Sequence, residues 1–135
     1  MSRAKGFGRL LVAIYGVFAI SAMARAGFQI LTKFDSAPLA YTLSAIAAAV
    51  YLLATLALAL PGAAWEKAAW ITVGFEFAGV LTVGVLSLLV PALFDHPTVW
   101  SQFGAGYAFV PVVLPLIGMV WLVRVRQVGA REASN

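Results

Sequence analysis

Four apolar stretches, each about as long as a bilayer is thick, constrain this chain more than any other feature of its sequence. A hydrocarbon core of about 30 Å needs roughly 20 apolar residues in a helix. We expect membrane-spanning helices at about residues 7–29, 37–60, 68–93 and 107–125 of the 135-residue sequence. The connections between them are too short to hold another domain. The sequence therefore predicts one integral membrane domain over residues 1–135, an all-α bundle of four antiparallel transmembrane helices.

Composition supports the membrane class and excludes several functions. Hydrophobic residues make up 63% of the chain and charged residues 10%, whereas soluble domains carry about 25% charged residues. With one histidine, His96, and no cysteine, the chain alone cannot build a bis-His haem site or a His/Cys zinc site. It also lacks a nucleophile–base set and a glycine-rich phosphate loop. We therefore expect no enzyme activity, no cofactor, no bound metal and no nucleic-acid partner.

The distribution of basic residues predicts how the chain is oriented. The two ends and the connection around residues 61–69 carry seven lysines and arginines, whereas the opposite side carries only Arg25 and Lys33. Lysine and arginine accumulate in cytoplasmic connections. Both termini should therefore be cytoplasmic, with the basic ends close to anionic lipid head groups.

Glu76 is the clearest candidate for function, because an ionisable group within an apolar span is expensive and usually has a role. It follows Trp70 by six residues, which places it about 9 Å into the membrane from the cytoplasmic side. One interpretation is a carboxylic acid that burial keeps neutral and that fastens helices by hydrogen bonds. The others are a proton or cation site, and a partner for the basic group of another subunit.

Polar residues at helical spacing predict an interior polar line around Glu76. In the third span, Thr72 and Glu76 share a stripe with small residues, and the second and first spans carry comparable stripes. Small and polar residues are typical of helix interfaces in membranes. By depth, the residues predicted to form this intramembrane polar site are Glu76, Tyr15, Tyr51, Thr55 and Thr72.

A second group of candidates lies toward the predicted outer face. Arg25 is about 24 Å beyond Arg9 along the first helix, so a direct Arg25–Glu76 ion pair is not favoured. We consider Arg25 either an interfacial side chain that reaches toward water or a binding group for a substrate or head group. The outer-face candidates, which could form an aromatic and charged cap or an ordinary interfacial belt, are Arg25, Gln29, Lys33, Asp35, Tyr41, Asp95, Trp100 and Tyr107.

Two sequence stretches carry a resemblance to a known group of proteins. They are residues 33–41, KFDSAPLAY, and residues 99–107, VWSQFGAGY. With the four spans and the basic tail, the chain resembles an uncharacterised family of small actinobacterial four-helix integral membrane proteins. The resemblance implies a multi-pass protein of the bacterial plasma membrane, and it brings no catalytic or binding residues with it.

Three functions remain open from the sequence. The first is a non-enzymatic accessory or scaffold subunit of a membrane complex, with membrane lipids and other subunits, or further copies of the chain, as partners. The second is a small oligomeric transporter or channel that uses Glu76 as a proton or cation site. The third is lipid or quinone binding through Arg25 and the outer aromatic residues.

Overall fold

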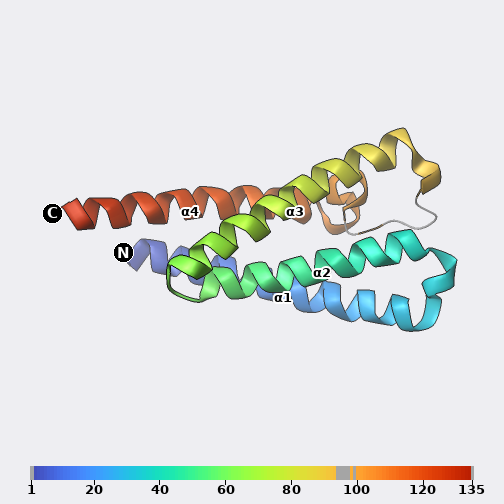
Figure 1. Cartoon of the computed structure of the whole chain (residues 1–135), viewed down its shortest axis with the longest axis horizontal. Helices are drawn as coiled ribbons and strands as arrows, with labels where there is room; N and C mark the ends of the chain where they lie inside the picture. Colours follow the sequence, from blue (N-terminus) through green and yellow to red (C-terminus); the bar gives the residue numbers. More distant parts are fainter. Residues whose placement is uncertain (1, 94–97, 99, 135) are drawn as a thin grey trace.

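The protein is an all-α bundle. The computed structural model describes residues 2–93, 98 and 100–134, and the regular elements within them are helices. The α-helices are α1 (Ser2–Lys33), α2 (Pro38–Ala59), α3 (Ala63–Leu89) and α4 (Val110–Ser134), with short 3-10 helices η1 (Phe34–Ser36), η2 (Pro91–Leu93) and η3 (Ser101–Tyr107). In Figure 1, α1 and α2 lie side by side, α3 is inclined across them, and both chain ends lie at the same end of the bundle. Each of the four α-helices is long and apolar enough to cross a membrane, so a helix is present at each of the four predicted spans.

The helix boundaries differ from the predicted ones for local reasons. α1 continues to Lys33, four residues beyond the predicted end at residue 29. α3 begins at Ala63, directly after Pro61-Gly62, because residues 63–67 are helix-compatible although less apolar. It ends at Leu89 because Pro91 disfavours the helical conformation of Val90, whose φ is −132° and ψ 67°. The first helical turn of α4 contains Pro111, a position where the missing N–H is tolerated.

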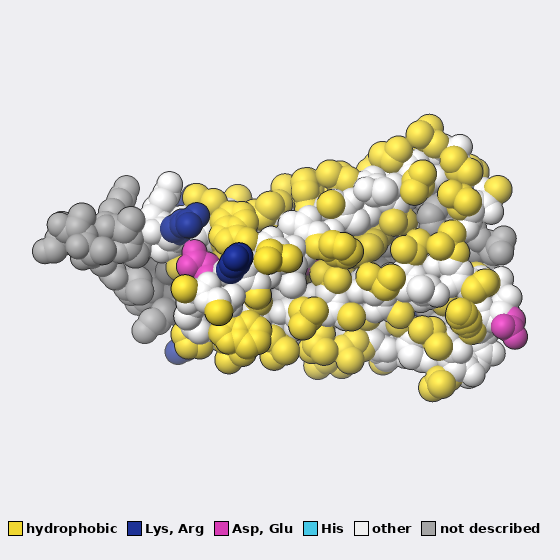
Figure 2. Space-filling model, viewed as in Figure 1, with side chains coloured by type: hydrophobic (Ala, Val, Ile, Leu, Met, Phe, Trp, Pro, Cys, Tyr) yellow, Lys and Arg dark blue, Asp and Glu magenta, His cyan; other side chains and the backbone are white. Residues whose placement is uncertain are grey.

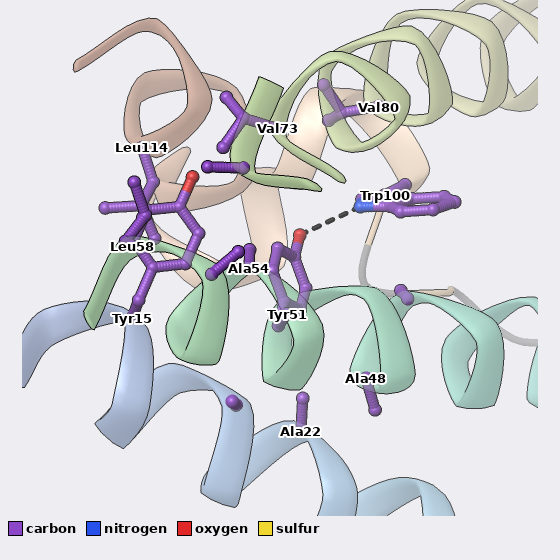
Figure 3. Close-up of a cluster of buried hydrophobic side chains, with 14 of the residues drawn as sticks. Tyr15, Ala22, Ala48, Tyr51, Ala54, Leu58, Val73, Val80, Trp100 and Leu114 are labelled. Atoms are coloured by element: carbon purple, nitrogen blue, oxygen red, sulfur yellow. Dashed lines mark hydrogen bonds between the residues drawn. The ribbon is translucent and has the colours of Figure 1, made fainter. Parts of the chain in front are cut away.

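Small residues allow α1 and α2 to pack closely. The buried core contains Ala19, Ala22 and Ala26 from α1, together with Ala47, Ala48, Ala54 and Ala57 from α2. Ala22 and Ala48 lie in the space between the two helices in Figure 3. Without side chains beyond Cβ, helix backbones can approach closely, and van der Waals contact then drives association in a membrane.

The outside of the bundle is covered with large apolar side chains. Val17, Leu53, Ile71 and Val120, one from each α-helix, are at least half exposed. Figure 2 shows hydrophobic side chains over nearly the whole body of the molecule, with lysine, arginine and acidic groups confined to its ends. Such a surface would promote aggregation in water and is suited to contact with lipid.

The segment that includes Trp100 and η3 packs onto α3 and α4, and the Trp100 side chain reaches Tyr51 of α2. Trp100 is 3% exposed. A Cβ on Gly79 of α3 would lie 2.6 Å from the Trp100 ring, and a Cβ on Gly84 would collide with the Phe103 ring. These two glycines therefore provide the space for the inserted aromatic rings. The backbone of the segment is strained, because Gln102 and Phe103 have φ of 52° and 60°, in the left-handed region that non-glycine residues seldom adopt.

Candidate functional site: a polar cluster around Glu76

Glu76 lies fully inside the bundle. Its side chain is 0% exposed, and its carboxyl oxygens Oε1 and Oε2 accept hydrogen bonds of 3.1 and 3.2 Å from the Tyr15 hydroxyl. Tyr15 is itself 0% exposed. The pair joins the middle of α3 to the middle of α1, 61 residues apart in the chain. A buried polar group is expensive without a partner, so this bond ties the two helices together.

Tyr51 of α2 brings a second hydroxyl to the same region. Its side chain is 0% exposed, and its oxygen accepts a hydrogen bond of 2.8 Å from the indole Nε1 of Trp100. Tyr51 belongs to the same buried core as Tyr15, the hydrogen-bond partner of Glu76. Figure 3 shows Tyr15 and Tyr51 reaching from α1 and α2 toward α3, with the dashed Tyr51–Trp100 bond beside them. The cluster therefore includes groups from α1, α2 and α3, and from the residue preceding η3.

The structure does not place the two predicted threonines on Glu76. The Thr55 hydroxyl donates to the carbonyl of Tyr51 at 2.7 Å, and the Thr72 hydroxyl donates to the carbonyl of Ala68 at 2.9 Å. Both bonds lie within the threonine's own helix, which is a common alternative for short hydroxyl side chains. Sequence spacing placed them on the correct stripes, but it could not tell which way the hydroxyls turn.

The Tyr15 and Tyr51 hydroxyls can donate or accept hydrogen bonds, and the Glu76 carboxyl group can bind a proton or, when ionised, a cation. No group of three histidine, cysteine, aspartate or glutamate side chains that could hold a metal ion occurs among the described residues. Asp95 and His96 lie outside the described residues.

Arg25 and Tyr107 form the main polar contact toward the other end of the bundle. The Arg25 Nη1 donates a hydrogen bond of 2.6 Å to the Tyr107 hydroxyl, and the guanidinium also lies 5.3 Å from the centroid of the Tyr107 ring. The Phe18 ring packs edge-on against both Tyr107 and Tyr51. Aromatic contacts therefore connect the Arg25 region to the Tyr51 region, whereas Arg25 has a hydrogen-bond partner other than Glu76.

The structure describes five further outer-face candidates, Gln29, Lys33, Asp35, Tyr41 and Trp100, which differ in exposure. Lys33 is exposed with its ammonium 5.8 Å from the Phe28 ring centroid, and Asp35 is exposed on η1. Gln29 is half-buried on α1, and Tyr41 is buried near the start of α2 in a small cluster with alanines. Trp100 was expected at the outer interface, but the structure places it in the bundle interior, because its indole nitrogen reaches Tyr51 and Gly79 leaves room for its ring. The side chain is therefore buried and not exposed in an outer belt, and its depth in the bilayer stays a prediction.

Sequence analysis missed the residues that hold the inserted segment. The Thr98 backbone N–H donates to the Ser101 Oγ at 2.8 Å, and the Trp100 N–H donates to the Thr98 Oγ1 at 3.1 Å. The Gln102 N–H donates to the Ser87 Oγ of α3 at 2.8 Å. Serine and threonine side chains that bond to nearby backbone are typical of turns. The spacing of Thr98 and Ser101 around Trp100 was the available signal for a turn there.

No protein-family model, curated protein or solved structure matches this chain. The resemblance to small actinobacterial membrane proteins therefore stays a prediction.

Proposed function

We propose that this chain is a non-enzymatic accessory or scaffold subunit of a membrane complex. The observation that carries the proposal is the complete enclosure of Glu76, with its carboxyl group held by the Tyr15 hydroxyl. An intramembrane acid used in this way fastens α3 to α1 and leaves the apolar exterior free for lipids and neighbouring helices. Buried polar contacts of this kind can define a single helix arrangement, which a scaffold requires.

The proposal includes an orientation. The helices cross the plasma membrane of a bacterium in alternating directions, with both termini in the cytoplasm. The chain ends lie together in the fold, and the basic residues concentrate at those ends and in the connection between α2 and α3. The partners are other membrane subunits or further copies of this chain.

Native purification tests the subunit role. The protein would be extracted from its source membrane in a mild detergent, and the mass and composition of the complex determined by native mass spectrometry. We expect a stable assembly that contains at least one other membrane protein. A monomer or homodimer without any other protein, recovered under several mild detergents, would contradict the accessory role.

A second candidate function is a small oligomeric transporter or channel with Glu76 as its proton or cation site. Its support is the Tyr15 hydroxyl on the acid, together with the Trp100 indole on Tyr51 at the start of a segment with strained backbone. Movement of that segment would give ions access to Glu76. In proteoliposomes, flux that Glu76→Gln abolishes would support this function, whereas equal flux from wild type and variant would exclude the Glu76 site. Glu66→Gln, at the first turn of the same helix, is the matched control.

The third candidate, lipid or quinone binding through Arg25 and the outer aromatic residues, has weaker support. The Arg25 guanidinium bonds to Tyr107, and the Trp100 ring is turned into the bundle.

A further inference from the structure

A groove lies between α1, α2 and α4 at the end of the bundle where both chain ends lie. It has a volume of about 410 Å³ and is lined by Gly8, Arg9, Val12, Ala13, Leu58, Ala59 and Trp121. Small-molecule sites commonly occupy roughly 300–1,000 Å³. Arg9, Ala13 and Ala59 are exposed, so the groove opens onto the surface of the bundle.

Small residues explain why the groove exists. A Cβ on Gly8 would lie 2.6 Å from the Trp121 ring, so the indole packs directly against the α1 backbone at Gly8. Beside that contact, Ala13 and Ala59 leave space that larger side chains would fill. The walls that remain are apolar, since Val12, Leu58 and the Trp121 ring provide them.

The groove has one cation at one end and apolar side chains beyond it. The charged head group and the apolar acyl chains of a phospholipid follow one another in the same order. Arg9 is the charged residue of the lining, and it follows Arg3 and Lys5 in the basic N-terminal part of α1. In the proposed orientation, this basic end of the helix is at the level of the cytoplasmic head groups. Ala13 lies one helical turn, about 6 Å, deeper, where acyl chains are found. Among the residues that the structure describes, no acidic side chain lines the groove.

We propose that this groove binds an anionic phospholipid, with one acyl chain along the apolar walls and the phosphate at Arg9. A guanidinium can donate two parallel hydrogen bonds to a phosphate, which a lysine ammonium cannot reproduce. The preference for an anionic lipid follows from the positive charge of the chain, +4 overall, and from the absence of an acid in the lining to compensate Arg9. This site is independent of the subunit role and lies at the opposite end of α1 from Arg25.

Native mass spectrometry with two lipids tests the proposal. The full-length protein in detergent would be titrated with phosphatidylglycerol and with phosphatidylcholine of identical acyl chains. We expect phosphatidylglycerol to bind at least several-fold more tightly, and Arg9→Gln to remove that preference. Ala13→Phe should weaken the binding of both lipids, because the ring would occupy the apolar part of the groove.

Arg126→Gln is the matched control, because Arg126 is exposed on α4 and does not line the groove. It should leave the preference unchanged. Equal binding of the two lipids by the wild type, or equal losses in Arg9→Gln and Arg126→Gln, would overturn the proposal and indicate nonspecific attraction to a basic protein. If Ala13→Phe does not fold, as judged by far-ultraviolet circular dichroism, Ala59→Leu provides the steric test.

Discussion

The indole Nε1 of Trp100 donates a hydrogen bond of 2.8 Å to the hydroxyl of Tyr51, across 49 residues of chain. This bond joins the segment that follows α3 to the middle of α2. It also places a large aromatic ring in the buried core that contains Tyr51 and Tyr15, the hydrogen-bond partner of Glu76. Trp100, which lies in the connection between the third and fourth spans, is therefore part of the interior.

A double-mutant cycle measures this contact. Trp100→Phe removes the donor, Tyr51→Phe removes the acceptor, and the double variant removes both. Since a net hydrogen bond contributes about 0.5–1.5 kcal/mol, we expect a coupling free energy of that size, and each single variant should be less stable than wild type. Reversible unfolding in mixed micelles, followed by far-ultraviolet circular dichroism, gives the free energies. Strictly additive effects of the two substitutions would show that the bond does not contribute to stability.

Gly79 should tolerate no added side chain, because the Trp100 ring occupies the space where a Cβ would be. Overpacking of a well-packed interior typically costs about 1–3 kcal/mol, and we expect a loss of unfolding free energy in this range for Gly79→Ala. Gly74→Ala on the same helix is the control, since nothing lies within 4 Å of a Cβ at Gly74. Alanine there should be neutral or stabilising, because it favours the helix. Equal effects of the two substitutions would show that Trp100 does not pack against Gly79.

The number of membrane spans follows from the sequence because it depends only on the length and apolarity of each segment. All four predicted spans correspond to helices. Their ends were less predictable. Proline at residue 91 ends α3 at Leu89, whereas hydropathy alone extended the third span to residue 93. Hydropathy indicates whether a segment is apolar enough to lie in a bilayer, but it does not indicate where the hydrogen bonding of a helix ends.

The candidate site was predictable in part, for a similar reason. Helical spacing and depth placed Tyr15 and Tyr51 near Glu76, because rise per residue is the same in every α-helix. The inward position of Trp100 was not predictable in this way. It depends on a turn at Thr98 and Ser101, on left-handed backbone at Gln102, and on a glycine in another helix. These are tertiary features, and tryptophan is also common at membrane interfaces.

The Glu76 carboxyl group should be neutral at neutral pH, because burial disfavours the charged form of an acid and its described hydrogen-bond partner, Tyr15, is uncharged. Infrared difference spectroscopy against Glu76→Gln should show a protonated-carboxyl C=O band that persists through the neutral range. Tyr15→Phe should shift that band to higher frequency, because the carboxyl loses a hydrogen bond. A carboxylate band in the wild type at neutral pH would contradict this prediction and would favour a cation site over a hydrogen-bonded acid.

The proposed orientation can be tested directly. The chain has no cysteine, so a single introduced cysteine is labelled without a signal from any other thiol of the chain. Ser36 in η1 and Ala64 at the start of α3 are both exposed, and they lie just beyond the two ends of α2. If the termini are cytoplasmic, a membrane-impermeant maleimide should label Ser36→Cys in intact cells and Ala64→Cys only after permeabilisation. The reverse pattern would place the termini outside, against the bias of the basic residues. Labelling of both sites in intact cells would show that α2 does not cross the membrane, because its two ends would then lie on the same side.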